Sequence, residues 1–189
     1  MARKPSCEDD VSRSRKPVFN VQKHHASHLH YDFRMEIGDV LKSWAIPKGP
    51  SMDPAVKRLA LQVEDHDLGY ADFEGVIEEG RYGAGPVLVW DTGWFEPVPG
   101  AAGGTAEAML ARGALAVILH GHRLKGRFSL FEMKGKPGQW LLVKQRDPEA
   151  EPDRDVTGDY TTSVLTGRTI EDLERAVAAG RLKTYHCSR

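Results

Sequence analysis

Histidines are concentrated at one place in this chain. Four of its eight histidines fall in the seven residues from His24 to His30, and Asp32 and Arg34 follow closely. Successive side chains of a β-strand point to opposite faces, so in a strand His30, Asp32 and Arg34 share one face. The imidazole and the carboxylate can then reach one cation from the same side. The guanidinium, one pleat further, can bind an anion beside that cation.

The rest of this segment favours a metal site over an ordinary surface strand. The residues on the opposite face are apolar and fit a core: Leu29, Tyr31, Phe33 and Met35. His24, arriving from the preceding strand, can supply a third protein ligand beside His30 and Asp32. Such a set leaves coordination positions open for water and substrate, as a catalytic metal requires. Its nitrogen and oxygen donors suit Mn, Fe, Co or Zn, and the spacing does not choose among them.

The competing interpretation is a solvated, histidine-rich loop that binds metal adventitiously. We assign His25 and His28 to such a loop, since both fall out of phase with the polar face. For His30, Asp32 and Arg34 we prefer the functional interpretation, because a solvated face ordinarily mixes Lys, Glu, Thr and Ser and needs no histidine.

A second group of polar side chains follows further along the chain. Lys48 lies in a Pro-Lys-Gly-Pro turn, which is rigid and presents one cation. Arg58 and Glu64 lie in an alternating segment, and His66 comes at its end, a usual place for a catalytic side chain. Tyr70 follows four residues later. Taken singly, each of these residues also fits a charged loop with a half-buried histidine.

Short alternating segments, separated by turn signals, predict the elements that must position these residues. The expected strands cover residues 18–22, 30–37, 40–46, 58–64, 87–91, 115–120, 123–134 and 139–144, with a tight turn at 37–40. Strands this short and this close favour an antiparallel barrel or sandwich. Two helices are expected, one capped by Thr105 and ending before Gly113, the other capped by Thr169 and ending at Gly180.

Composition divides the chain into three parts. Residues 1–17 are polar and mixed in charge, and we expect them to form a flexible leader. Residues 18–147 hold the dense strand pattern. Residues 148–189 are expected to form a linker, acidic and rich in Pro and Asp up to residue 159, and then a helical tail.

The bulk composition limits the class of protein. The formal net charge is -1, so contact with nucleic acid must come from a local basic patch and not from the overall field. Cys7 and Cys187 lie near the termini without a disulfide framework, which favours a reducing compartment. No apolar run has the length of a membrane span, and no secretory signal follows Met1. We therefore expect a soluble, cytoplasmic monomer with no membrane partner.

Several runs of this sequence together resemble the 3′-phosphoesterase domain of bacterial DNA ligase D. The most specific run is VQKHHASHLHYDFR at residues 21–34. Further runs are LKSWAIPKGP at 41–50, VEDH at 63–66 with Tyr70, GRYGAG at 80–85, LKGRF at 124–128 and WLLVK at 140–144. The resemblance covers residues 18–147, and residues 163–168 resemble the segment that follows this domain in the multidomain ligases.

The resemblance implies a mainly β fold, a small closed antiparallel β-barrel of about eight strands with one or two short flanking helices. It implies an enzyme that heals the 3′ ends of broken DNA. Such an enzyme removes a terminal 3′-ribonucleoside to leave a 3′-phosphate, and then removes the phosphate to leave a 3′-OH. The implied cofactor is a divalent metal, typically Mn²⁺, with Co²⁺ and Zn²⁺ as alternatives.

Residue roles follow from the same resemblance, position by position. The metal ligands would be His24, His30 and Asp32. The phosphate contacts would come from Arg34, His66, Lys48 and Arg58, with Tyr70 and Glu64 as further catalytic residues and Gln22 nearby.

The N-terminal leader, and the polymerase and ligase modules found in the multidomain ligases, affect which reaction and which partners we expect for this chain. Family members carry an N-terminal arm with a Lys-Arg-Asp-Phe-like motif, which bears on the phosphomonoesterase step, and this leader lacks it. We therefore expect the diesterase step above all. The chain holds no polymerase or ligase module, so the expected partners besides DNA 3′ ends are a separate ATP-dependent DNA ligase, a primase-polymerase and Ku.

Two other functions compete with the enzyme. The first is a non-catalytic module that recognises 3′ ends or docks on a ligase or Ku; the presence of every key residue argues against it. The second is metal storage or a cupin-like enzyme for small molecules, which does not explain why Arg34, Lys48 and Arg58 accompany the ligand set.

Overall fold

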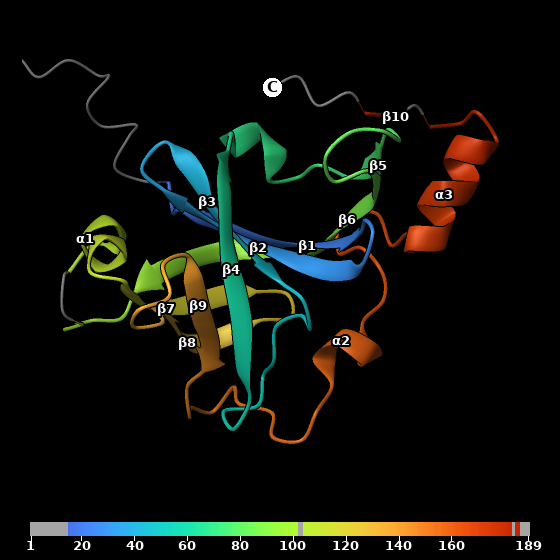
Figure 1. The fold of residues 1–189 in the computed structure, drawn as a ribbon. Helices are drawn as coiled ribbons and strands as arrows, with labels where there is room; N and C mark the ends of the chain where they lie inside the picture. Colours follow the sequence, from blue (N-terminus) through green and yellow to red (C-terminus); the bar gives the residue numbers. More distant parts are fainter. Residues whose placement is uncertain (1–14, 102–103, 183, 186–189) are drawn as a thin grey trace, which may run out of the picture.

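Eight antiparallel strands close into a barrel in the computed structural model, which describes residues 15–101, 104–182 and 184–185 (Figure 1). Around the barrel the order is β1-β2-β3-β4-β9-β8-β7-β6, and pairing between β1 and β6 closes it. The bounds are β1 (Val18–His25), β2 (Leu29–Ile37), β3 (Val40–Ile46), β4 (Lys57–His66), β6 (Gly85–Pro97), β7 (Ala114–Gly121), β8 (Lys125–Glu132) and β9 (Gln139–Lys144). The expected fold class, a mainly β closed barrel, is confirmed.

Short elements surround this barrel. They are the strands β5 (Gly75–Ile77) and β10 (Thr184–Tyr185), which extend the sheet beyond β6, the 3-10 helix η1 (Leu68–Tyr70), and the helices α1 (Ala106–Ala111), α2 (Val156–Asp159) and α3 (Ile170–Ala178). In the view of Figure 1, α1 and α3 lie on opposite sides of the barrel. The pattern did not predict β5, β10 or α2, because two to four residues are too few to show a period.

Both expected helix starts are confirmed by their caps. The side chain of Thr105 accepts a hydrogen bond from the backbone of Ala108 at the start of α1. At α3, Thr169 and Asp172 form a reciprocal capping box. Each cap satisfies backbone N–H groups that have no partner inside the helix, which is why these residue types begin helices.

The alternation of β1 and β2 separates a core face from a polar face. Phe19 and Val21 on β1 lie opposite Met35 and Phe33 on β2, and all four side chains are at most 1% exposed. Since side chains alternate along a strand, the residues between them point to the outer face of the barrel. Figure 1 shows the strands of this region, β1 to β3, side by side.

The outer face of β1 and β2 is nevertheless covered by the chain that follows β4. The amide of Asn20 donates to the Ala71 carbonyl at 2.8 Å. The amide of Gln22 donates to the carbonyls of Tyr70 at 3.2 Å and Phe73 at 3.1 Å. These bonds hold η1 and the segment after it against the polar outer face of β1 and β2. That face is therefore buried, although it is not part of the apolar core.

The chain beyond residue 159, after the segment expected to be a linker, contacts the barrel at several points. The indole of Trp90 donates to the Tyr160 carbonyl at 2.7 Å. The Arg123 guanidinium lies between the two rings, 5.1 Å from the centre of Trp90 and 4.8 Å from that of Tyr160. Further along, the Val164 backbone donates to the Val89 carbonyl. The division of the chain after residue 147 stays a prediction, and the leader residues 1–14, Cys7 and Cys187 lie outside the described residues.

Within the described ranges, no helix combines the length and the apolar character that crossing a membrane requires.

Candidate metal centre and active site

Two histidines and one carboxylate converge on the outer face of β1 and β2. The antiparallel register places His24 opposite His30, and Asp32 lies two residues further along β2. The Nδ1 atom of His24 is 3.4 Å from Asp32 Oδ2, and the Nε2 atom of His30 is 3.6 Å from Asp32 Oδ1. One ligand atom from each of the three residues can be chosen so that all lie within 4.8 Å of one another.

Backbone carbonyls determine which nitrogen of each histidine is free. Nε2 of His24 lies 2.7 Å from the Gly83 carbonyl, and Nδ1 of His30 lies 3.0 Å from the His28 carbonyl. A carbonyl only accepts, so these nitrogens donate to the carbonyls, and the opposite nitrogens are the ones that can bind a metal. Both of these nitrogens face the Asp32 carboxylate, so each can either donate a proton to it or, once deprotonated, share a cation with it.

The donor set fits a divalent metal in both chemistry and spacing. Metal–ligand bonds of about 2.1 Å at tetrahedral to octahedral angles separate neighbouring donor atoms by about 3.0–3.5 Å. The two nitrogen–oxygen separations, 3.4 and 3.6 Å, are close to that range. A metal-bound histidine also commonly donates its other ring N–H to a backbone carbonyl, which holds the ring in place. His24, His30 and Asp32 are therefore the residues that could hold a metal.

The carboxylate of this cluster is ionised. Burial alone would raise the pKa of Asp32, but the hydrogen bond to His24 and the charges of Arg34 and His30 lower that pKa below its usual value. With a side chain only 9% exposed, Asp32 depends on these neighbours for its charged form. The cluster consequently offers a cation one carboxylate charge and two imidazole nitrogens.

Arg34 is held by protein groups on every side. Its Nε donates to Gln22 Oε1 at 2.8 Å. Its Nη1 donates to Ser43 Oγ at 2.8 Å and lies 2.9 Å from His66 Nδ1. Its Nη2 donates to Asp32 Oδ2 at 3.2 Å. A guanidinium has five N–H donors, so these four contacts leave at most one, on Nη2, for a substrate oxygen.

His66 lies beyond Arg34, at the end of β4. Its Nδ1 is close to both Arg34 and the Glu64 carbonyl, which is 2.9 Å away, so Nε2 is the nitrogen available to a substrate. Burial and the Arg34 charge lower the pKa of His66 below 6.5, which keeps the ring neutral near pH 7. The ring of Tyr70 packs against it with centres 5.1 Å apart, and Tyr70 in turn stacks on Phe73.

The structure places the expected site residues in two groups. The first comprises the metal cluster with Gln22, Arg34, His66 and Tyr70, and Glu64 joins it through its backbone carbonyl while its side chain is exposed. The second comprises Lys48 and Arg58, which line a hollow of about 360 Å³ together with residues 153–155 and Thr157. Arg58 Nε is buried there without a partner among the described residues.

Three contributors to the site were not predicted. Ser43 lies opposite Arg34 in the β2–β3 register, and this pairing follows from the predicted turn at residues 37–40. The carbonyls of His28 and Gly83 orient the two histidine rings. No side-chain pattern reports a backbone carbonyl, so these two could not be found from residue types.

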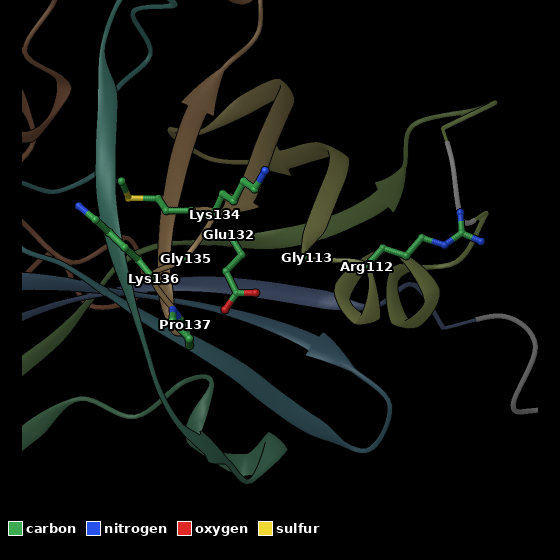
Figure 2. A pocket seen from close by; sticks show the side chains of 8 residues that line it. Arg112, Gly113, Glu132, Lys134, Gly135, Lys136 and Pro137 are labelled. Atoms are coloured by element: carbon green, nitrogen blue, oxygen red, sulfur yellow. The ribbon is translucent and has the colours of Figure 1, made fainter.

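A separate hollow lies between the end of α1 and the β8–β9 turn, on strands that are not neighbours of β1 or β2 (Figure 2). It measures about 190 Å³ and is lined by Arg112, Glu132, Lys134 and Lys136 among others. The Glu132 carboxylate already accepts a hydrogen bond from the Gly138 backbone. In Figure 2 the three cationic side chains point in different directions and do not converge, so this hollow lacks the features of a reaction site.

Comparisons with known proteins agree with this geometry. Residues 22–132 match the model of the DNA Ligase D 3'-phosphoesterase domain family. Over 154 residues, 79% of this chain, the sequence is 54% identical to the multifunctional non-homologous end joining protein LigD of Pseudomonas aeruginosa. It is 42% identical over 133 residues, 69% of the chain, to the multifunctional non-homologous end joining DNA repair protein LigD of Mycobacterium tuberculosis.

These relatives are much longer proteins. The matched regions amount to 18% of the Pseudomonas protein and 16% of the Mycobacterium protein, so this chain corresponds to one part of each. The matched part contains His24, His30, Asp32, Arg34 and His66. On the family match and these identities, the chain belongs to the DNA ligase D 3′-phosphoesterase domain family.

Proposed function

We propose that this protein is a Mn²⁺-dependent phosphoesterase that heals DNA 3′ ends in double-strand break repair by non-homologous end joining. The observation that carries the proposal is the cluster of two imidazole nitrogens and the Asp32 carboxylate, whose ligand atoms lie within 4.8 Å of one another. Membership of the 3′-phosphoesterase family supports the substrate class, and similarity to non-homologous end joining proteins supports the pathway. The mixed donor set is compatible with Mn²⁺, and also with Co²⁺ or Zn²⁺.

The residues around the cluster supply the rest of the chemistry. A bound divalent metal would provide a Lewis acid for a phosphoryl oxygen. Arg34 orients Asp32 and His66 and puts a fixed positive charge beside the negative charge that develops in the transition state. When His66 Nδ1 accepts from Arg34, Nε2 carries the proton and can donate it to the phosphate or to the leaving oxygen.

The proposed reaction has two steps. The diesterase step removes a terminal ribonucleoside and leaves a 3′-phosphate, and the monoesterase step releases that phosphate. We assign Lys48 and Arg58 to supporting phosphate contacts, because both line one hollow, which also holds Arg154 and the carboxylates of Asp53, Asp153 and Asp155. The proposed partners of the protein are a DNA ligase, a primase-polymerase and Ku, and we propose that it acts as a monomer in the cytoplasm.

The test uses a primer–template whose primer ends in one ribonucleotide, incubated with Mn²⁺ and compared with an all-deoxy primer and a 3′-phosphate primer. We expect shortening of the first substrate to a 3′-phosphate end and, more slowly, conversion of the third to a 3′-OH. His30→Ala should lose both metal binding and turnover. His122→Ala is the matched control, because His122 is an exposed histidine on another turn of the barrel.

Failure of the wild type to shorten the ribonucleotide-ended primer at any enzyme concentration would refute the diesterase proposal. Tight binding of that primer without turnover would favour the alternative of a non-catalytic 3′-end module. Wild-type activity in His30→Ala would refute the ligand assignment.

A further inference from the structure

One aromatic side chain near the metal cluster has no role in the fold. Tyr82 is 91% exposed, whereas the other exposed large apolar side chains of the described residues are between 36% and 47% exposed. The nearby rings of Tyr70 and Phe73, by contrast, stack on each other and are half-buried. A tyrosine ring ordinarily buries most of its area, so a ring this exposed contributes little to stability and is available to a ligand.

The backbone holds Tyr82 at the edge of the cluster. The carbonyl of the next residue, Gly83, lies 2.7 Å from Nε2 of His24. A Cβ atom on Gly83 would be 3.3 Å from the same imidazole ring. Consecutive Cα atoms are about 3.8 Å apart, so the base of the Tyr82 side chain is one residue from a group that touches a metal ligand.

Glycines and turns fix the segment that carries this ring. Gly80, Gly83 and Gly85 all have positive φ angles, of 82°, 75° and 136°. Backbone hydrogen bonds close two turns, from Arg81 to the Glu78 carbonyl and from Ala84 to the Arg81 carbonyl. Gly85 begins β6 and packs so closely on the His25 carbonyl that a Cβ would lie 2.2 Å from it. The position of Tyr82 is therefore set by its neighbours and not by its own ring.

We propose that Tyr82 is a stacking platform for a nucleobase next to the scissile phosphate. The inference rests on the proposed function, because a 3′ terminus whose phosphodiester lies at the cluster has one base on each side of that phosphate. Every base has a π-face, so aromatic stacking adds affinity without reading sequence. Stacking needs no charge, so it also suits a chain whose 26 Lys and Arg residues are balanced by 27 Asp and Glu residues.

The first experiment measures binding apart from turnover. Fluorescence anisotropy without divalent metal gives the Kd for the ribonucleotide-ended primer–template with wild type, Tyr82→Ala, Tyr82→Phe and the exposed-apolar control Leu165→Ala. We expect Tyr82→Ala to bind about 5- to 10-fold more weakly, since one base–aromatic stack is lost. Tyr82→Phe and Leu165→Ala should stay within about twofold of wild type, because the first keeps the aromatic ring and the second lies outside the loop. Equal losses for Tyr82→Ala and Tyr82→Phe would overturn stacking in favour of a hydroxyl contact.

The second experiment removes the base instead of the ring. Two further primers carry an abasic site, one at the terminal and one at the penultimate nucleotide. The Tyr82→Ala defect should disappear on one of them, because the ring then has nothing to stack on. A defect that persists on both primers, or wild-type affinity of Tyr82→Ala on the intact primer, would overturn the proposal.

The two proposals fail in different ways. A wild-type protein that shows the ring-dependent and base-dependent binding but does not cleave with Mn²⁺ overturns the proposed function and supports stacking. A protein that cleaves but is indifferent to Tyr82→Ala in Kd and in KM overturns stacking alone. Wild type that does not bind the primer at all overturns both.

Discussion

Replacing Arg34 with lysine distinguishes two possible roles of this side chain, organising the site and binding the scissile phosphate. The variant keeps the positive charge beside Asp32 but loses the planar fork that now reaches Gln22, Ser43 and His66. If Arg34 mainly organises the site, the change must destabilise the fold as well as the chemistry. If Arg34 only binds the scissile phosphate, the change should leave the free energy of unfolding nearly unaltered.

The contacts of Arg34 give the expected size of the effect. Four hydrogen bonds, between 2.8 and 3.2 Å long, hold a side chain that is 3% exposed. A lysine ammonium can keep the contact with Asp32 and one other, so about two bonds are lost. A hydrogen bond to a charged group contributes about 1.5–3 kcal/mol, and the free energy of unfolding should therefore fall by about 3–6 kcal/mol. Misplacement of the site should also lower kcat/KM by about 100-fold.

Urea unfolding followed by tryptophan fluorescence measures the first quantity, since Trp44 and Trp90 are fully buried and report on the core. Arg127→Lys, an exposed arginine on β8, is the control and should change the free energy of unfolding by less than about 0.5 kcal/mol. An Arg34→Lys protein that unfolds at the wild-type urea concentration and yet has lost its activity would refute the positioning role.

Three further perturbations follow from the same contacts. The NMR titration midpoint of His66 in the metal-free protein should lie below 6.5, because burial and the neighbouring guanidinium lower its pKa; a midpoint above 6.5 would contradict this environment. Lys144→Met should lower the free energy of unfolding by about 3 kcal/mol at pH 7, since the largely buried Asp147 carboxylate loses the fully buried ammonium that pairs with it. Burial raises the pKa of Asp147, but hydrogen bonds, first from Lys144, lower it below 3.8 in the folded state, so this stability is present above about pH 4 and is lost as pH falls through the folded pKa. The wild type should accordingly lose more stability than Lys144→Met between pH 5 and pH 3 in urea titrations, and equal losses would argue against the pair. Gly85→Ala places a Cβ 2.2 Å from the His25 carbonyl at a φ of 136°, which should shift the loop that carries the Gly83 carbonyl, the group that orients His24. Calorimetry should then find Mn²⁺ affinity about 10- to 100-fold weaker; unchanged affinity would show that the Gly83 carbonyl is dispensable.

The strand-phase argument predicted the central part of the site. His30, Asp32 and Arg34 do share a face, and the inward residues Tyr31, Phe33 and Met35 are buried in the core. The face of each side chain could be predicted because a strand has a period of two, and five residues are enough to show that period. Leu29, placed on the apolar face, is 45% exposed because it begins the strand where the core ends.

Other parts of the site depend on contacts between distant segments. Lys48 and Arg58 share a hollow with residues 153–155, and the carbonyl that orients His24 comes from Gly83, 59 residues away. Loop conformations and backbone groups set these contacts, and neither leaves a periodic pattern in the sequence. The turn at 37–40 was the exception, since a predicted hairpin fixes its register and thereby pairs Arg34 with Ser43.

The most direct test of the central claim is anomalous diffraction from crystals of this protein soaked in Mn²⁺. The account predicts one strong peak about 2.0–2.3 Å from His24 Nδ1, His30 Nε2 and an Asp32 oxygen. It also predicts that Gly83 and His28 keep their carbonyls on the outer nitrogens. A peak coordinated by other residues, or no peak in crystals whose protein cleaves 3′ ends with Mn²⁺, would contradict the account.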